Sequence, residues 1–514
     1  MQTRPKKQHK RGAHVRTRLI ITGLLVLLQI ALFIIPAYLF ADQATWLYIL
    51  LQSISVIIVV RIISKKGNPS YKLTWIVFIL VFPLVGGLSY LIWGGSRVFP
   101  HVKRRMKRFS DGEQAFLTQD PMVKNRLSYE DLHHSRQSAY LNSSSGFPVY
   151  DNTECTYLSP GEVALPVILR ELEKAQKFIF IEFFILAEDS MWEQIHKVLL
   201  EKRKAGVEVR VIFDDFGSIT RQYRRFAQRL QEEGIKVSIF NRIKPSVNIF
   251  MNNRNHRKIM VIDGKVAFTG GINIADEYIN KTKRFGYWMD CAVMLKGRAV
   301  SSFTVMFLSM WAFCTGKKQR YAKFVTDYVC PTAGFVQPYC DGPINDKNPG
   351  EGIYMQMLNT AQKYVYIATP YLIVDNAMIR ALTLAAESGI DVRIITPFVP
   401  DKKYVHPVTQ HCYDELLAAG VRIFEYTPGF IHSKFFVSDD RVATVGTINM
   451  DYRSFFFHFE CGVWMCGTDS VTDIKDHFLK LQAQSEEIEL KKWRKRPLLT
   501  KIKQSVLYLF APFM

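Results

Sequence analysis

The sequence predicts an α/β protein with two homologous halves related by pseudo-twofold symmetry, preceded by an N-terminal transmembrane helical region. Three observations lead to this prediction. The pattern His-x-Lys-x4-Asp occurs twice, at residues 256–263 and 432–439. Helical patterns alternate with short apolar strand patterns, which is typical of an α/β sheet. Three apolar runs of about twenty residues lie near the N-terminus, and each is long enough to span a bilayer.

The membrane region is expected over residues 1–96, with apolar segments at 19–40, 44–63 and 73–93. Pro83 and the Gly86-Gly87 pair would break the third segment into a re-entrant hairpin. The distribution of basic residues around the segments favours a cytoplasmic N-terminus and cytoplasmic catalytic halves. Eight cysteines without a Cys-x-x-Cys pair agree with a reducing compartment. We therefore expect a multi-pass protein of the cell membrane.

Residues 97–150 are polar and are expected to form an irregular linker and lead-in. The two halves follow at residues 151–330 and 331–485. They are identified by repeats that keep their order, because residues 175–182 resemble 361–368 and residues 206–212 resemble 389–395. Two such halves would bring His256 and His432 to one shared cleft, so neither half is expected to be active alone.

The paired histidines and lysines of the motifs are the candidate catalytic residues. In a strand, residues two apart point to the same face, so His256 and Lys258 would face one way, as would His432 and Lys434. A neutral imidazole can attack phosphorus and form a covalent intermediate. A second imidazole can protonate the leaving alcohol and later deprotonate the acceptor. The two ammonium groups would hold the nonbridging oxygens.

The acidic residues of the motifs have two possible roles. Asp263-Gly264 is typical of a two-residue hairpin turn, so Asp263 is expected to hold that turn, and Asp439 the equivalent one. Direct participation of both in catalysis stays open as the second interpretation. Each motif is followed by a Gly-x-x-Asn segment, in which Asn273 and Asn449 offer amide donors to the same phosphate oxygens.

A metal site is not expected. Lysine is not a usual metal ligand, and no pairs of Cys or His combine at a metal-binding spacing. The other ten histidines carry no motif and are assigned to the surface or the core. The sequence therefore predicts chemistry without a metal or another cofactor.

The charge balance indicates a phosphate-rich partner. There are 67 Lys and Arg against 46 Asp and Glu, a formal net charge of +21. This charge suits an anionic bilayer, and nucleic acid would be attracted equally. Residues 486–514 combine many basic residues with the apolar run 506–510, which predicts a basic amphipathic tail at the membrane interface. A solvated basic tail is the alternative.

The doubled motif resembles the phospholipase D superfamily, and the chain from about residue 65 to the C-terminus resembles the bacterial cardiolipin synthase family within it. The narrower resemblance rests on residues 75–94, 213–217, 254–258 and 493–497. It implies two phospholipase D-like α/β sandwich halves.

The resemblance also implies a reaction. One phosphatidylglycerol gives its phosphatidyl group to a histidine and releases glycerol, and a second phosphatidylglycerol takes the group up to give cardiolipin. His256 would be the nucleophile and His432 the general acid and base. Asp290 and Glu460 match the acidic residues that orient the imidazoles in the family. The implied partner is phosphatidylglycerol in an anionic membrane, with no nucleic acid, and no oligomeric state is predicted.

Two other functions share these residues. A membrane-bound phosphodiesterase that uses water as the acceptor, on phospholipid or nucleic acid, needs the same six motif residues. A non-catalytic scaffold is disfavoured because both motifs are intact.

Overall fold

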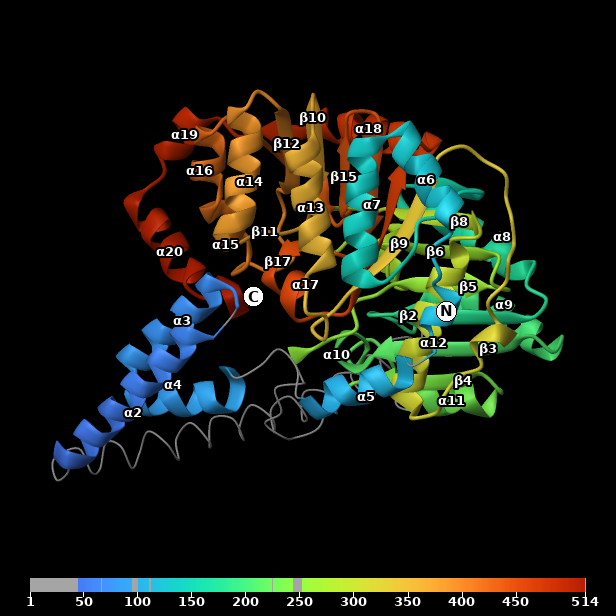
Figure 1. Cartoon of the computed structure of the whole chain (residues 1–514), viewed down its shortest axis with the longest axis horizontal. Helices are drawn as coiled ribbons and strands as arrows, with labels where there is room; N and C mark the ends of the chain where they lie inside the picture. The colour runs from blue at the N-terminus through green and yellow to red at the C-terminus, as the bar shows by residue number, and fades with distance from the viewer. Residues whose placement is uncertain are drawn as a thin grey trace, which may run out of the picture.

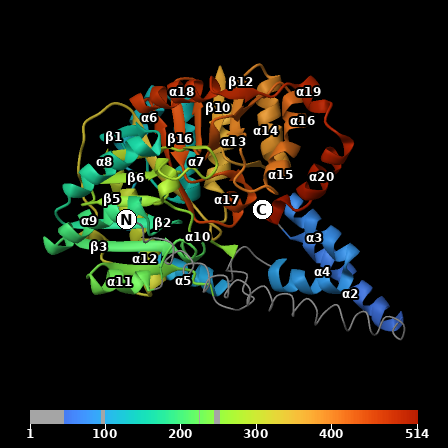
Figure 2. The same cartoon turned by 180° about the vertical axis from the view of Figure 1, so that it is seen from behind.

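The computed structural model describes residues 45–65, 67–94, 100–110, 112–223, 225–243 and 252–513. Two sheet-containing halves lie side by side, and a helical region near the N-terminus projects from the second half (Figure 1). The view from behind places the C-terminus at the base of this helical region (Figure 2). The predicted division into two α/β halves is confirmed.

The first half contains a seven-stranded sheet in the order β1 (Thr153–Leu158), β8 (Ala292–Gly297), β6 (Val266–Gly270), β5 (Ile259–Ile262), β2 (Phe178–Phe183), β3 (Glu208–Asp214) and β4 (Lys236–Phe240). β2, β3 and β4 are parallel, and the other neighbours are antiparallel. The helices that cover one face are α8 (Gly161–Glu173), α9 (Ser190–Lys204) and α11 (Phe226–Glu232). The opposite face is covered by α12 (Val300–Thr315).

The second half contains an eight-stranded sheet in the order β19 (Ser485–Glu487), β13 (Arg422–Tyr426), β12 (Asp391–Pro397), β10 (Tyr364–Ala368), β15 (Phe435–Ser438), β16 (Val442–Gly446), β18 (Glu460–Cys466) and β9 (Phe335–Asp341). Apart from β19, this order matches the first sheet strand for strand. One face is covered by α13 (Pro349–Thr360), α14 (Asn376–Glu387) and α16 (Tyr413–Ala418). The face toward the first half is covered by α18 (Asp469–Gln482).

The two halves share one apolar core. Side chains alternate along β2, so Phe180 points into this shared core while Ile181 faces α8 and α9. Phe180 stacks on Phe307 of α12 with ring centroids 4.4 Å apart. Val437 and Val463 of the second half belong to the same core. The halves are therefore one packed unit.

Two short parallel strand pairs lie near the motifs. β7 (Tyr287–Met289) of the first half pairs with β14 (Gly429–Ile431) of the second half. β11 (Leu372–Ile373) pairs with β17 (Met450–Asp451), directly before α17 (Tyr452–Phe456). The first pair joins the two halves by main-chain hydrogen bonds close to residue 432.

The described part of residues 97–150 is mostly helical, which corrects the expectation of an irregular linker. Its helices are α5 (Pro100–Ser110), α6 (Pro121–Glu130) and α7 (Leu132–Ser145). Asp120 and Asp131 cap α6 and α7 with their side chains, and Gly146 ends α7 in a left-handed conformation. Gln137 of α7 accepts a hydrogen bond of 2.8 Å from Trp464 of β18. The polar composition hid these helices because each buries only a few apolar residues.

The helical region near the N-terminus consists of α2 (Thr45–Ser64), α3 (Pro69–Val81), α4 (Pro83–Ser89) and the π-helix η1 (Tyr90–Gly94). The predicted apolar segment 19–40 lies outside the described residues. The third predicted segment is broken before Pro83, where the chain turns back so tightly that a Cβ on Gly86 would lie 2.6 Å from the carbonyl oxygen of Phe78. Within the described ranges, no helix combines the length and the apolar character needed to cross a membrane.

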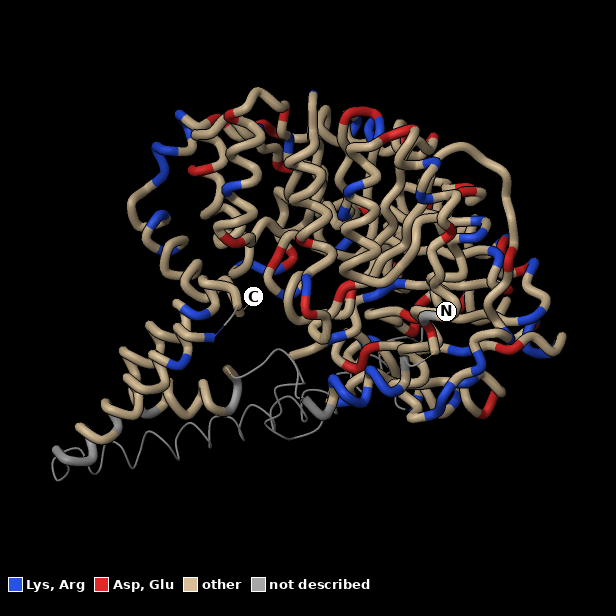
Figure 3. Tube along the Cα trace, viewed as in Figure 1, with Lys and Arg blue, Asp and Glu red and all other residues tan. Residues whose placement is uncertain are grey.

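The C-terminal segment forms α19 (Leu490–Arg494), α20 (Leu498–Tyr508) and the short helix η6 (Ala511–Phe513). One side of α20 packs on α15 (His406–His411), and the rings of His411 and Tyr508 stack at 4.3 Å. Lys and Arg follow α19 and α20 along this edge of the molecule (Figure 3). The ring of Phe513 contacts Trp75 of α3 at 5.4 Å. The C-terminus therefore ties the helical region to the second half.

Candidate active site

The two motif histidines lie in extended segments before β5 and β15, three residues ahead of the first residue of each strand, and not within the strands in which they were expected. Each segment is held by the main chain of the other half. The backbone N–H of His256 donates to the carbonyl of Phe459 at 2.9 Å, and that of His432 donates to the carbonyl of Met289 at 2.7 Å. This reciprocal pairing brings both histidines to the boundary between the halves.

A carboxylate from the opposite half orients each imidazole. Nδ1 of His256 lies 2.9 and 3.0 Å from the two carboxylate oxygens of Glu460, and Nδ1 of His432 lies 2.7 Å from Asp290 Oδ2. An ionised carboxylate can only accept, so Nδ1 carries the proton and Nε2 presents its lone pair. The two rings are thus prepared in the same way, with each half completing the site of the other.

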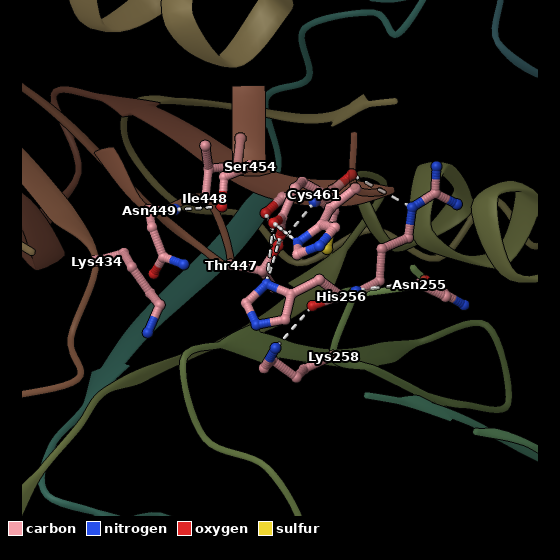
Figure 4. Close-up of polar contacts among 12 residues, drawn as sticks. Asn255, His256, Lys258, Lys434, Thr447, Ile448, Asn449, Ser454 and Cys461 are labelled. Carbon is pink, nitrogen blue, oxygen red and sulfur yellow. Dashed lines mark hydrogen bonds and ion pairs between the residues drawn. The ribbon is translucent and has the colours of Figure 1, made fainter. Parts of the chain in front are cut away.

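The two carboxylates are supported differently, and the motif residues alone do not reveal this difference. Thr447 donates its hydroxyl hydrogen bond to Glu460 (Figure 4). The equivalent residue in the first half is Gly271, where a Cβ would lie only 2.0 Å from Asp290 Oδ1. The longer acid, Glu460, is therefore paired with Thr447, and the shorter acid, Asp290, with Gly271. Alignment of the two Gly-x-x-Asn segments would have shown this difference between threonine and glycine.

The motif lysines are buried beside the histidines, each 1% exposed. Lys258 Nζ donates to the carbonyl of His256 at 2.7 Å, and Lys434 Nζ donates to the carbonyl of His432. Burial lowers the pKa of Lys258 from 10.5 to about 7 and that of Lys434 from 10.5 to about 8. These ammonium groups would regain favourable interactions when an anion enters.

Both imidazoles are neutral near pH 7 in this arrangement. Burial, followed by the charges of Lys258 and Lys434, lowers the pKa of His256 well below 6.5. Burial, followed by the charge of Lys434, lowers the pKa of His432 to about 4. Burial alone would raise the pKa of Asp290, but His432 and Lys434 outweigh it and the pKa is lowered. A neutral imidazole beside an ionised carboxylate is the state needed for nucleophilic attack.

The aromatic surroundings of the two rings differ. His432 is packed among Trp288, Tyr278 and Phe430, with ring centroids 5.3, 5.5 and 5.9 Å away. His256 contacts His458 at 5.6 Å, and His458 Nδ1 lies 3.7 Å from Glu460 Oε1. His458 carries no sequence motif and was assigned to the surface or the core, but the structure places it at the site. It occupies the position that Trp288 has in the other half.

The two asparagines have different contacts. Asn273 Oδ1 accepts from the backbone N–H of Ile185 at 3.0 Å, and its Nδ2 donates to the hydroxyl of Tyr278 at 2.7 Å. Asn449 follows β16, whose last residue, Gly446, donates its backbone N–H to the carbonyl of Lys434 at 3.2 Å. The buried Oδ1 of Asn449 has no hydrogen-bond partner among the described residues. Asn273 therefore uses its amide within the local structure. Asn449, whose Nδ2 would be the donor to a phosphate oxygen, is the remaining candidate of the two for a contact with substrate.

Asp263 and Asp439 hold backbone turns apart from the catalytic candidates, which favours the first of their two predicted roles over direct participation in catalysis. The carboxylate of Asp263 accepts three backbone hydrogen bonds of 2.7 to 2.8 Å, and that of Asp439 accepts three of 2.8 to 2.9 Å. These bonds hold the residues that lead into β2 and β10. In each motif the histidine lies before a strand, β5 or β15, and the aspartate lies after the same strand. The length of the strand therefore separates each aspartate from the histidine of its motif.

The described residues include two groups of three metal-ligand side chains, but neither environment favours a cation. One group contains His256, His458 and Glu460, and the buried ammonium groups of Lys258 and Lys434 face the same space. The second group includes Asp131, which already pairs with Arg441 at 2.9 Å. The first arrangement suits a phosphate anion better than a metal ion.

Comparison with known proteins agrees with this geometry. A family profile described as "Cardiolipin synthase, PLD-like domain" matches residues 168–311 and 354–482, and one described as "Phospholipase D-nuclease N-terminal" matches residues 53–95. An uncharacterized protein of Streptococcus mutans is 43% identical, with 89% of this chain and 99% of that protein covered. A cardiolipin synthase of Geobacillus sp. is 34% identical, with 95% and 99% covered. A cardiolipin synthase of Alkalihalophilus pseudofirmus is 32% identical, with 97% and 100% covered.

A solved structure shares the fold. The crystal structure of phosphatidylserine synthase from Haemophilus influenzae matches with a TM-score of 0.56 at 14% identity, covering 74% of this chain and 98% of that chain. It supports the two-half α/β architecture, while the relatives of higher identity define the narrower group. The chain belongs to the cardiolipin synthase family of phospholipase D-like proteins.

Proposed function

We propose that this protein is a phosphatidyltransferase that makes cardiolipin and glycerol from two molecules of phosphatidylglycerol. The observation that carries this proposal is the reciprocal pair of histidine and carboxylate contacts across the two halves. A neutral imidazole with a free Nε2 can attack the phosphorus from one side, and the second imidazole, once it is protonated on substrate binding, can protonate the leaving oxygen on the other side. The two buried ammonium groups suit the negative charge of the phosphodiester.

In the first step, Nε2 of His256 attacks the phosphorus of one phosphatidylglycerol. A P–N bond forms and the P–O bond to the glycerol headgroup breaks. His432 takes up a proton on Nε2 from solvent when the anionic substrate binds, and it donates this proton to the departing oxygen, so neutral glycerol leaves. The bound phosphodiester anion raises the pKa of His432 from its low value, because a nearby negative charge favours the protonated ring.

In the second step, the terminal hydroxyl of a second phosphatidylglycerol gives its proton to His432. The hydroxyl oxygen attacks phosphorus, the P–N bond breaks and His256 leaves as a neutral imidazole. Lys258, Lys434 and Asn449 neutralise or bind the nonbridging oxygens as charge develops in both steps. The site returns to its starting state, and no metal ion takes part in either step.

The reaction is proposed to take place at the cytoplasmic face of the cell membrane, with the N-terminal region as a multi-pass anchor. Several features support this location. Side chains of α2 and α3 such as Ile57 and Leu73 are exposed, although they are apolar. On α20, Leu498, Ile502 and Val506 form an exposed apolar row beside basic residues. Tyr71 of α3 contacts Phe457 at 6.0 Å, next to His458, so the anchor adjoins the site.

The main alternative is a hydrolase that uses the same intermediate. Incubation of the purified protein with labelled phosphatidylglycerol in mixed micelles, without added metal, distinguishes the two. Cardiolipin with an equal amount of glycerol is the expected result. Phosphatidic acid as the main lipid product would refute the transferase and favour a phosphodiesterase, and cleavage of DNA in a parallel assay would indicate a nuclease.

A further inference from the structure

Lys402 is a basic residue near the catalytic candidates that belongs to neither motif. It follows β12, in the loop before α15. β10 and β12 are parallel, and the last residue of β10, Ala368, pairs with Phe435, which follows Lys434 directly. The carboxyl ends of β10 and β12 therefore open toward the second motif, and the loop that carries Lys402 lies at that edge of the sheet.

The hydrogen bonds of Lys402 fix its position relative to Asn449. Lys402 Nζ donates to the hydroxyl of Tyr371 at 2.5 Å and to Asp401 Oδ2 at 3.0 Å. Tyr371 directly precedes β11, which pairs with β17, and β17 follows Asn449. Lys402 is thus held one strand pair away from Asn449.

Lys402 differs from the motif lysines in exposure. Its side chain is 44% exposed, whereas Lys258 and Lys434 are 1% exposed. Its charge also contributes, after burial and the nearer charges, to the lowered pKa of His256. An ammonium group has three N–H donors, and the two contacts with Tyr371 and Asp401 use two of them. The third remains for an anion that arrives from outside the buried site.

The proposed reaction requires such a contact. The acceptor phosphatidylglycerol carries its own phosphodiester, separated from the attacking hydroxyl by a three-carbon glycerol. When the hydroxyl reaches the phosphohistidine, the acceptor's own phosphodiester therefore lies a short distance from the reacting phosphate, and both groups are negatively charged. Water and simple alcohols bring no such charge. A basic group at the rim of the site would favour the lipid acceptor over water.

We propose that Lys402 forms a second anion subsite, which binds the phosphodiester of the acceptor lipid while Lys258 and Lys434 hold the reacting phosphate. The subsite rests on the proposed function, because only a transferase with an anionic acceptor needs it. Lys402 is a specificity-determining residue in this scheme, since it selects the acceptor and takes no part in bond cleavage.

The test compares two acceptors for one intermediate. Labelled phosphatidylglycerol is supplied in mixed micelles with a short primary alcohol, and the ratio of cardiolipin to phosphatidyl alcohol is measured. The Lys402→Gln variant is expected to lower this ratio about tenfold, the effect of one lost hydrogen bond to a charged group. Lys402→Arg should restore most of the ratio. Lys403→Gln is the matched control, because this neighbouring lysine is also exposed, and it should keep the wild-type ratio.

Three results would overturn the subsite. An unchanged ratio in Lys402→Gln would exclude selection by Lys402, even if both products decreased together. An equal fall in the ratio for Lys403→Gln would indicate a general surface charge effect. A wild-type protein that makes phosphatidyl alcohol but no cardiolipin would reject the proposed function itself, and the acceptor subsite with it.

Discussion

Substitution of Lys258 by methionine is expected to stabilise the fold while it abolishes transfer. The lysine is buried, and its ammonium group has lost most of its hydration. Burial lowers its pKa from 10.5 to about 7, which measures how strongly the folded site disfavours the charge. Methionine has a similar length and no charge, so it fills the same space without this cost.

The magnitude follows from the pKa. At about 1.36 kcal/mol per pKa unit, the change from 10.5 to about 7 corresponds to about 5 kcal/mol at pH values below 7. Loss of the hydrogen bond from Lys258 to the carbonyl of His256 removes about 1 kcal/mol. A net gain of about 3 to 4 kcal/mol in the free energy of unfolding is therefore expected near neutral pH. For Lys434, whose pKa falls only to about 8, the same reasoning gives a smaller gain of about 2 kcal/mol.

The pH dependence has a definite sign. Between pH 7 and 10.5 the unfolded lysine binds more protons than the folded one, so the destabilising contribution of Lys258 decreases as the pH rises through this window. The advantage of Lys258→Met should be largest below pH 7 and should disappear toward pH 10.5. Thermal unfolding in detergent, followed by intrinsic fluorescence at several pH values, measures the difference. Lys403→Met replaces an exposed lysine and serves as the control, which should show no such trend.

Two outcomes would refute the reasoning. A Lys258→Met protein with a lower melting temperature than wild type at pH 6 would mean that the buried ammonium group stabilises the fold. A gain that stays constant from pH 6 to pH 10 would mean that the effect comes from packing and not from the charge.

Three further predictions concern the motif histidines, the turn aspartate and one orienting carboxylate. His256→Ala and His432→Ala should each lower cardiolipin synthesis by about a thousandfold or more while the protein stays folded. Near-normal synthesis by either variant would exclude the two-histidine mechanism. Asp263→Asn weakens three backbone contacts, so it should lower the free energy of unfolding by about 1 to 3 kcal/mol in denaturant and keep the activity per folded molecule. A loss of activity without a loss of stability would instead indicate that Asp263 takes part in catalysis. Glu460→Gln should lower the rate about a hundredfold, since the amide no longer fixes the tautomer of His256, whereas a rate equal to wild type would contradict the orienting role.

Much of the candidate site could be predicted because its residues recur at fixed spacing. The repeated His-x-Lys pattern identified His256 and His432, and the resemblance identified their acidic partners. The hairpin pattern at Asp263 indicated a turn, and the contacts of that carboxylate agree. His458 was missed because a single histidine has no periodic signal, and its importance depends on a ring from the other half.

The helices within residues 97–150 were missed for another reason. Their burial depends on a sheet that lies hundreds of residues later in the chain, as the contact of Gln137 with Trp464 illustrates. A polar sequence gives little indication of such a surface, because only a few positions of each helix are covered. Capping aspartates marked the helix starts, but this signal is short and was outweighed by composition.

The sequence by itself determined the two α/β halves, the pairing of histidine with lysine in each, and the family, because all three can be recognised from short sequence patterns that occur twice. Only the tertiary structure decided that each imidazole is oriented by a carboxylate of the opposite half, that Asp263 and Asp439 stand apart from the reaction, and that Lys402 lies at the rim. The physical reason is that hydrogen bonding and burial act over a few ångströms, and residues far apart in the chain meet at that range only after the two sheets have packed together.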